Sequence, residues 1–383
     1  MRILYDYQAF SMQTHGGISR CFAELLKHIP NGVDTKLGVK ESDNVYLSGI
    51  DNIMPANYQY NNFLGKKHFW GKWHMHYLYD KISGGGYYPN YNKNYSIELL
   101  KKGDYDVFHP TYFDDYFLPF LNGKPFVLTI HDMIPELYPQ YFTRDDKQIK
   151  MKQKLISLAS GVIAVSENTK NDIIRMMNVP QEKIHVVYHG CSFATTIQKK
   201  EKPYNFPYIL FVGGRGDYKN FYPFMKAIMP ILRKYNDLHV VCTGKPFNED
   251  EINNMNALGI KDRFLYSWVK NDDSMLALYH QAECFVFPSE YEGFGLPILE
   301  AYQAECPVLL NNASCFPEIA GDAAVYFNMN SDDTDLAEKL ELLLMMSSSD
   351  RNALLEKQKL RLARYSWEES AKRMADIYQS ICS

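Results

Sequence analysis

Short apolar runs alternate with stretches of helical period along most of the chain. Apolar runs bounded by glycine, proline or polar residues predict buried strands, and apolar residues repeated every three to four positions predict helices. This alternation favours an α/β fold with parallel sheets between helices. Strands are predicted over residues 2–5, 106–108, 126–129, 161–165, 185–188, 208–212, 239–242, 264–266, 284–287 and 307–310. Helices are predicted over residues 18–28, 168–177, 220–235, 250–258, 273–282, 297–304 and 333–346.

The alternation pauses between Gly190 and Tyr208, where lysines and prolines accumulate as in a linker. We predict an N-terminal α/β domain, a linker, a second α/β domain and a final helix, over residues 1–190, 191–206, 207–365 and 366–383. Ser366 and Glu369 have the spacing of a capping box at the start of that helix, which we expect to cross back onto the first domain. Two such domains can share a cleft at the carboxyl edges of their sheets, where open α/β sheets bind ligands.

Composition and charge exclude several classes of protein. The 383 residues are 46% hydrophobic and 22% charged, with a net charge of −4, so neither disorder nor nucleic acid as the main partner is expected. The seven cysteines are scattered without a C-x-x-C pair, which is typical of a reduced chain without a structural metal. No apolar run is long enough for a signal peptide or a membrane span, and we expect a cytoplasmic protein.

The most informative segment covers residues 287–300, where a predicted strand leads into a loop and a helix. Gly293 and Gly295 allow the backbone to approach a ligand closely, and Pro297 fits the first helical turn. The helix N-terminus offers amides to an anion, whereas Glu292 and Glu300 would repel one. This combination indicates that the two carboxylates bind sugar hydroxyls.

Glu292 and Glu300 are seven residues apart, and the segment resembles the E-x7-E signature of glycosyltransferase family 4. These are the retaining group 1 enzymes with the GT-B fold, in which two Rossmann-like domains face a central cleft. The resemblance implies that Glu292 lies near the donor sugar and that Glu300 binds the nucleotide ribose. It also implies that the backbone of Phe294, Gly295 and Leu296 contacts the sugar and the diphosphate.

A second loop, over residues 211–220, follows a predicted strand and carries Arg215 and Lys219. Two cations there can neutralise a diphosphate without a metal. The resemblance assigns them that role, with stabilisation of the departing diphosphate as their contribution to catalysis. Asp217 and Tyr218 depart from the family pattern, which often has proline and arginine at these positions.

Two sites are predicted on the first domain. Gly16 and Gly17 lie between a strand and a helix, and the family uses this glycine loop near the donor phosphate. His131 follows a strand, and in related transferases the matching histidine contacts the donor sugar rather than acting as a general base. Asp132 is expected to hold its loop by an Asx-type bond.

Three further features carry weaker predictions. By analogy, Val269 holds the donor base through its backbone, and Lys245 is either a donor ligand or a surface lysine. Residues 63–95 are rich in aromatic side chains interleaved with lysines. They form the core of a helix pair, a peripheral membrane contact, or an acceptor site for which the candidates are Trp70, Trp73 and Tyr77.

No metal and no cofactor beyond the donor are expected. Asp104 and Asp106 match a D-x-D string that binds manganese in another glycosyltransferase fold, but Asp106 begins a predicted strand. Three histidines, His68, His74 and His76, lack a carboxylate or cysteine at ligand spacing.

The sequence is most similar to bacterial O-antigen and capsule mannosyltransferases. It predicts a retaining, metal-independent enzyme that moves a hexose, with mannose as the first choice, to a saccharide or lipid-linked saccharide at the inner face of the membrane. GDP-mannose is the first donor considered and a UDP-sugar is the alternative. Two other functions stay open: a GT-B sugar-nucleotide 2-epimerase and a non-catalytic sugar-nucleotide-binding protein.

Overall fold

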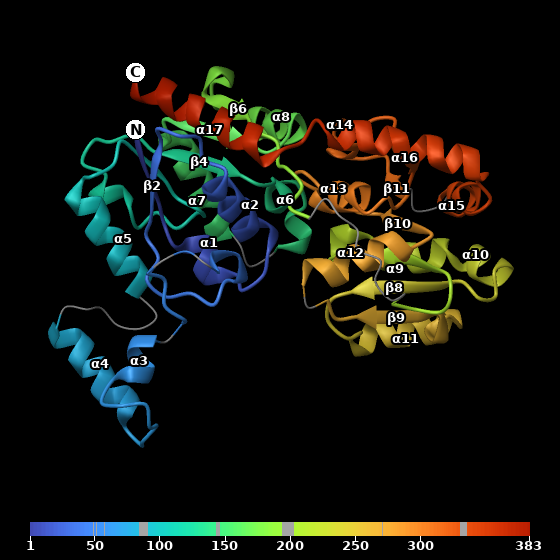
Figure 1. Ribbon diagram of the computed structural model, residues 1–383, viewed down its shortest axis with the longest axis horizontal. Coiled ribbons are helices and arrows are strands. Elements are labelled where there is room, and N and C mark those ends of the chain that lie inside the picture. Colours follow the sequence, from blue (N-terminus) through green and yellow to red (C-terminus); the bar gives the residue numbers. More distant parts are fainter. Residues whose placement is uncertain are drawn as a thin grey trace.

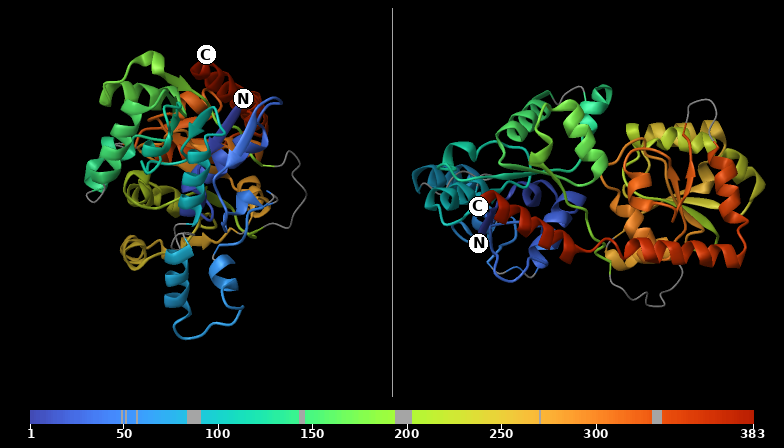
Figure 2. Two further views of the ribbon diagram at one scale, coloured as in Figure 1. Left: turned by 90° about the vertical axis from the view of Figure 1, so that its left-hand side faces the viewer. Right: turned by 90° about the horizontal axis from the view of Figure 1, so that it is seen from above.

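The computed structural model describes residues 1–48, 50, 52–56, 58–83, 91–142, 146–193, 203–269, 271–329 and 335–383. Two α/β domains lie side by side, and both chain termini are on the N-terminal domain (Figure 1). Each domain has parallel strands flanked by helices, as the views from the side and above show (Figure 2). The predicted α/β class is therefore confirmed. Part of the predicted linker, residues 194–202, lies outside the described residues.

The strands of the N-terminal domain form two parallel groups, in the orders β2-β1-β3 and β4-β5-β6. A parallel bridge between Phe108 and Phe126 sets β3 beside β4. Successive side chains of the first strand enter opposite hydrophobic clusters, Leu4 on one face and Ile3 and Tyr5 on the other. The strands are β1 (Arg2–Tyr5), β2 (Asp34–Leu37), β3 (Val107–His109), β4 (Val127–Ile130), β5 (Gly161–Ala164) and β6 (Ile184–Val186).

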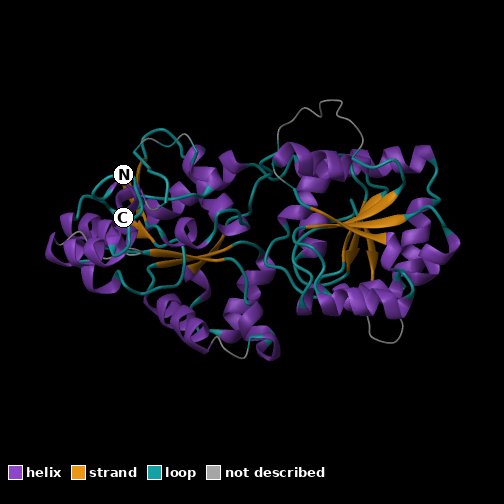
Figure 3. Ribbon diagram, turned by 90° about the horizontal axis from the view of Figure 1, so that it is seen from below, coloured by secondary structure: helices purple, strands orange, loops and turns teal. Residues whose placement is uncertain are grey.

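Helices cover both faces of these strands (Figure 3). Ser166 caps one of them, as its sequence position suggests, because its Oγ accepts a hydrogen bond from the Thr169 amide. The helices of this domain are α1 (Gln8–Met12), α2 (Gly17–Lys27), α3 (Tyr58–Asn62), α4 (Lys72–Ser83), α5 (Tyr91–Lys102), α6 (Ile134–Leu137), α7 (Asp146–Leu158) and α8 (Glu167–Met176).

The C-terminal sheet has the order β12-β11-β10-β7-β8-β9. Its first strand in the chain, β7, lies in the middle, and the chain later crosses to the other side of β7 to form β10. The connections that follow β7 and β10 therefore diverge, which makes the carboxyl ends of these two strands the topological switch point, the place where such sheets form a ligand crevice. The strands are β7 (Tyr208–Phe211), β8 (His239–Thr243), β9 (Phe264–Ser267), β10 (Cys284–Phe287), β11 (Val308–Asn311) and β12 (Val325–Phe327).

Every predicted strand is present, displaced by at most two residues at either end. The predicted helix over 220–235 is instead two helices, because Pro230 lacks the amide hydrogen that a helix interior needs. The strands β2 and β12 were not predicted: β2 is a polar edge strand and β12 is short. The helices are α9 (Phe221–Ala227), α10 (Met229–Lys234), α11 (Glu249–Leu258), α12 (Asp272–Gln281), α13 (Leu296–Gln303), α14 (Phe316–Ala320), α15 (Leu336–Leu344), α16 (Ser348–Leu362) and α17 (Trp367–Cys382).

The last helix, α17, lies on the N-terminal domain beside α2 (Figure 1). Its first residue, Trp367, is 2% exposed and donates a hydrogen bond from Nε1 to Ser192 Oγ at 2.9 Å. Near its other end, the Tyr378 hydroxyl is 2.7 Å from the Tyr5 hydroxyl of β1. The Ser366 hydroxyl accepts from the Glu369 amide, which is the N-cap half of the predicted capping box.

A buried histidine in this region makes stability depend on pH. His109 Nδ1 is 2.6 Å from the Tyr378 hydroxyl, and its Nε2 is 2.9 Å from Thr129 Oγ1. Burial lowers the pKa of His109 to about 3, so the folded chain resists a proton that the unfolded chain accepts below about pH 6.5. The free energy of unfolding should therefore fall as the pH drops from about 6.5 to about 3, by up to about 1.4 kcal/mol per pH unit from this group.

Urea unfolding of the wild type and of His109→Gln across this pH window measures the effect. The variant should be less stable at pH 7 but should lose less stability on acidification. The exposed His15 provides the control variant His15→Gln. An equal slope in the wild type and in His109→Gln would contradict the assignment.

Candidate active site

The two loops predicted to hold the donor meet at the crevice of the C-terminal sheet. The loop after β7 ends in a short 3-10 turn over Asp217–Lys219, and the loop after β10 leads to α13. The Glu290 amide donates to the Tyr218 carbonyl at 2.7 Å, and Asn220 Nδ2 donates to the Pro288 carbonyl at 3.0 Å. These bonds set the loops side by side, although their residues are far apart in the sequence.

At this junction Lys219 Nζ forms an ion pair with Glu292 Oε1. Both side chains are largely buried, with 18% and 14% exposed. Burial opposes the charge of Lys219, but the adjacent Glu292 carboxylate outweighs it, so the pKa of Lys219 lies above its ordinary value. The crevice therefore holds a fixed cation at neutral pH, together with a carboxylate that can bind hydroxyl groups.

Arg215 has a different partner. Its Nε donates to Glu251 Oε1 at 2.7 Å, and its Nη2 donates to the Lys245 carbonyl at 2.9 Å. The guanidinium also stacks over the Phe247 ring, 4.9 Å from the centroid, and the side chain is 9% exposed. The structure thus joins Arg215 to α11 rather than to the Lys219–Glu292 pair, and its contact with a diphosphate stays a prediction.

Glu300 lies on α13 and connects the two domains. Its Oε1 is 3.3 Å from Nη1 of Arg20, a residue of α2, and its Oε2 accepts from the Tyr279 hydroxyl at 3.1 Å. Arg20 also pairs with Asp272 at the start of α12, at 2.7 Å. Burial raises the pKa of Glu300, and the nearby Arg20 guanidinium acts in the opposite direction.

Sequence reasoning assigned no role to Arg20, Asp272 or Tyr279. Arg20 lies three residues after Gly17, about one helical turn. This spacing puts it near the glycine loop at the start of α2 and was the available signal. The other two residues have no local signal. The packing of α12 on α13 brings Tyr279 to Glu300, and the packing of the two domains brings Asp272 to Arg20.

The two predicted glycine loops face each other across the domains. A methyl group added to Gly17, at the start of α2, would lie 3.9 Å from Leu296 Cδ1, at the start of α13. Gly295 has a φ of +88°, which a residue with a side chain adopts only with strain. A side chain on Gly16 would collide with Gln13. Both helix N-termini therefore reach the same interdomain space.

Gly293 and Phe294 pack against the N-terminal domain. Gly293 lies so close to the His131 carbonyl that a methyl group would overlap it, and the Gly293 carbonyl accepts from Ser166 Oγ at 2.6 Å. The Phe294 ring is 4% exposed and packs on His189, with centroids 4.8 Å apart. Because its side chain is buried, Phe294 can contact a ligand only through its backbone.

His131 follows β4 at the carboxyl edge of the N-terminal strands. Burial lowers its pKa to about 4, so the ring is neutral near pH 7. Its Nε2 is buried and has no hydrogen-bond partner among the described residues. Asp132 Oδ1 accepts from the Ile134 amide at 3.1 Å, which is the predicted Asx-type bond.

Helix α8 forms a second contact between the domains. Glu318 of α14 accepts hydrogen bonds from the backbone amides of Glu167 and Asn168, at 2.7 and 2.9 Å. The hydroxyl of Tyr291, the residue before Glu292, donates to Asp172 Oδ2 at 2.5 Å. A carboxylate at a helix N-terminus is favourable, so Glu318 holds α14 against the N-terminal domain, and the Tyr291 bond holds the Glu292 loop there.

The weaker predictions fall at the same sheet edge. Lys245 follows β8 and is exposed, whereas Val269 follows β9 and is half-buried against the core. The Gly244 amide donates to the Ser267 carbonyl at 3.0 Å, which joins the two loops. Donor binding by Lys245 and Val269 stays a prediction.

The aromatic segment contains α4 and the start of α5, and α4 projects with α3 from the body of the N-terminal domain (Figure 1). Trp70 is 99% exposed, Trp73 45% and Tyr77 36%, so of the three alternatives a helix-pair core does not fit these side chains. The polar His76 is buried instead, with Nε2 3.0 Å from the Tyr91 hydroxyl. Residues 84–90 of this segment lie outside the described residues.

Both aspartates of the D-x-D string form ion pairs with Arg2. Asp104 pairs with the Arg2 guanidinium, and Asp106 lies 3.2 Å from the same group and also accepts from the Arg2 amide at 2.8 Å. Among the described residues, three side chains with metal-ligating atoms do lie close together elsewhere, in Cys21, His131 and His189. Sequence reasoning missed this group.

Comparisons with known proteins agree with this geometry. Residues 192–361 match the family described as glycosyl transferases group 1, and residues 74–194 match glycosyltransferase family 4. The chain belongs to the group 1, family 4 glycosyltransferases. The two matches adjoin at the predicted linker and together contain Lys219, Glu292 and Glu300.

Two relatives of this glycosyltransferase are described as O-antigen mannosyltransferases. RfbU of Salmonella typhimurium is 30% identical over 211 residues, which are 55% of this chain and 58% of that protein. O-antigen chain mannosyltransferase B of Escherichia coli is 26% identical over 270 residues, which are 67% of this chain and 70% of that protein. The chain thus spans little more than half the length of the first relative.

Solved structures with the same fold include HepE from Anabaena in complex with UDP-glucose. It has a TM-score of 0.69 at 16% identity, and the match covers 99% of this chain and 100% of that one. A glycosyltransferase from Rickettsia africae has a TM-score of 0.67 at 16% identity, with coverage of 99% and 98%. The predicted GT-B fold is confirmed.

Proposed function

We propose that this glycosyltransferase is a retaining mannosyltransferase that uses GDP-mannose as its donor and a saccharide as its acceptor. The observation that carries the proposal is the Lys219–Glu292 pair at the crevice of the C-terminal sheet. It is supported by relatives described as O-antigen mannosyltransferases.

In this proposal the Lys219 ammonium neutralises the donor diphosphate, and Glu292 accepts hydrogen bonds from the donor sugar. Glu300 binds the ribose and gives up its contact with Arg20 to do so. The neutral ring of His131 contacts a sugar hydroxyl. Fixed charges aimed at the departing group stabilise the transition state, because they need no reorganisation during the reaction.

The bond between the anomeric carbon and the phosphate oxygen breaks, and the acceptor oxygen attaches on the same face. The departing phosphate oxygen takes the proton of the acceptor hydroxyl. No group is oxidised or reduced. The step needs no metal, and we expect turnover to persist in EDTA.

The decisive experiment has two parts. A thermal-shift series with GDP-mannose and UDP-glucose identifies the donor, since a ligand that binds only the folded state raises stability with its concentration. NMR of the product formed with the identified donor then shows whether the anomeric configuration is retained. An epimerised nucleotide sugar formed without acceptor would instead establish the epimerase, and donor binding without turnover would establish a binding protein.

We also propose that the exposed aromatic side chains of α4 and the preceding loop bring the enzyme to the membrane that carries a lipid-linked acceptor. Trp70, Trp73 and Tyr77 are accompanied by the exposed Lys66 and Lys67, and such a mixture suits an anionic lipid surface. Among the described residues, no helix combines the length and apolar character needed to cross a bilayer.

Trp70→Ala combined with Trp73→Ala should reduce co-sedimentation with phosphatidylglycerol vesicles. Trp268 is 64% exposed on the C-terminal domain, so Trp268→Ala is the matched control. Unchanged vesicle binding together with a raised KM for a soluble acceptor would place these aromatics in the acceptor site instead.

A further inference from the structure

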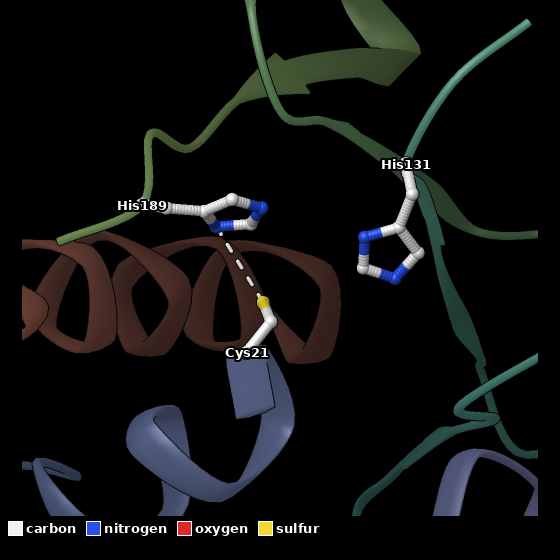
Figure 4. A group of neighbouring side chains, drawn as sticks. All are labelled: Cys21, His131 and His189. Carbon is white, nitrogen blue, oxygen red and sulfur yellow. Dashed lines mark hydrogen bonds between the residues drawn. The ribbon is translucent and has the colours of Figure 1, made fainter. Parts of the chain in front are cut away.

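Three side chains with metal-ligating atoms converge where the N-terminal domain meets the Glu292 loop. Cys21 comes from α2, His131 follows β4, and His189 follows β6. The Cys21 sulfur is 3.5 Å from His189 Nδ1, and one ligand atom from each of the three residues lies within 4.8 Å of the others. Figure 4 shows the His131 ring facing the other two side chains across a short gap.

The surroundings of this group suit a cation that prefers nitrogen and sulfur. Cys21 is 1% exposed and His189 is 7% exposed. His131 Nε2 is buried without a hydrogen-bond partner among the described residues, so no hydrogen bond at this nitrogen fixes the ring.

The ligand set distinguishes between classes of cation. One thiolate and two imidazoles favour zinc and similar metals, whereas magnesium, calcium and manganese prefer carboxylate and carbonyl oxygens. Ligand atoms around a tetrahedral zinc are about 3.3 to 3.6 Å apart, given the usual bond lengths. The 3.5 Å between the Cys21 sulfur and His189 Nδ1 already meets this value, whereas His131, whose ligand atom lies within 4.8 Å of the other two ligand atoms, must turn toward them on metal binding.

We propose that Cys21, His131 and His189 bind a divalent cation of the zinc class and that the occupied site inhibits sugar transfer. The inhibitory part rests on the proposed function, in which His131 contacts the donor sugar. On binding, the Cys21 thiol releases its proton to solvent and its sulfur bonds to the metal without a change of oxidation state. The metal then holds His131 toward Cys21, and the ring is no longer available to the donor.

Cobalt(II) is the probe for binding, because a cysteine thiolate bound to cobalt produces a charge-transfer band in the near ultraviolet. Wild-type enzyme titrated with cobalt should develop this band at one equivalent, and added zinc should remove it. Cys21→Ser should lose the band, whereas Cys382→Ser, at an exposed cysteine on the last helix, should keep it. No band, or an equal band in Cys21→Ser, would overturn the site.

Inhibition is measured separately, with zinc added to the transfer reaction. Zinc should inhibit the wild type and Cys382→Ser, and the concentration for half-inhibition should rise at least about tenfold in Cys21→Ser. A cobalt band with unchanged turnover in zinc would overturn the inhibitory part alone. A cobalt band in an enzyme that transfers no sugar would overturn the proposed function and leave the metal site standing.

Discussion

Lys219→Ala is expected to lower kcat/KM for sugar transfer by about 10²- to 10³-fold, as the loss of one fixed electrostatic contact to a departing group does elsewhere. Lys219 is the cation that the crevice holds beside Glu292, with 18% of its side chain exposed. Without it, charge that develops on the leaving diphosphate has no fixed cation at this position. Glu292→Ala should also reduce turnover, since it removes the partner of Lys219 and the proposed sugar contact.

Lys226→Ala is the matched control, because Lys226 lies on α9 and is exposed. Initial rates at several donor concentrations give kcat and KM, and circular dichroism shows whether each variant is folded. A folded Lys219→Ala variant with wild-type kcat/KM would refute the assignment. Loss of activity in Lys226→Ala as well would show that the effect is not specific to the crevice.

Trp367→Ala is expected to lower the free energy of unfolding by about 3 to 5 kcal/mol, the usual cost of deleting a buried aromatic side chain. Trp367 begins α17, packs 5.4 Å from the His189 ring, and lies against the backbone of Gly190. Its removal leaves a cavity where α17 meets the N-terminal domain and leaves the Ser192 hydroxyl without its indole donor.

Urea unfolding followed by circular dichroism measures this change. Two domains can unfold in separate transitions, so the shift is expected in the transition that includes the N-terminal domain. Trp268→Ala should change stability by no more than about 0.5 kcal/mol, because that side chain is exposed. An equally small change in Trp367→Ala would show that α17 does not stabilise the domain through this residue.

Local patterns were sufficient for the strands and for the loops that follow them. A buried parallel strand needs a continuous apolar run, and the runs that end at Val212 and Phe287 are followed by glycine and proline. The polar strand β2 has no such run. It is a strand because its backbone pairs with that of Arg2–Tyr5. The break near Pro230, by contrast, has a local signal, because a proline inside a helical pattern ends or kinks the helix.

The pairing of charges could not be read from the sequence. Arg215 and Lys219 stand four positions apart and were expected to act together, but the loop directs Arg215 to Glu251 and Lys219 to Glu292. Local spacing places residues on a loop, whereas the direction of each side chain depends on the elements that pack around it. The same holds for Arg20, whose partner Glu300 belongs to the other domain.

The sequence by itself determined the α/β class, the positions of the strands and the two loops that form the crevice, because these depend on short apolar runs, glycines and helix caps. Only the tertiary structure decided which side chains meet: Lys219 with Glu292, Arg20 with Glu300, and Cys21 with His131 and His189. The reason is physical. Parallel strands separated by helices bring loops that are distant in the chain to one sheet edge, and the packing of two such edges selects contacts that no local pattern encodes.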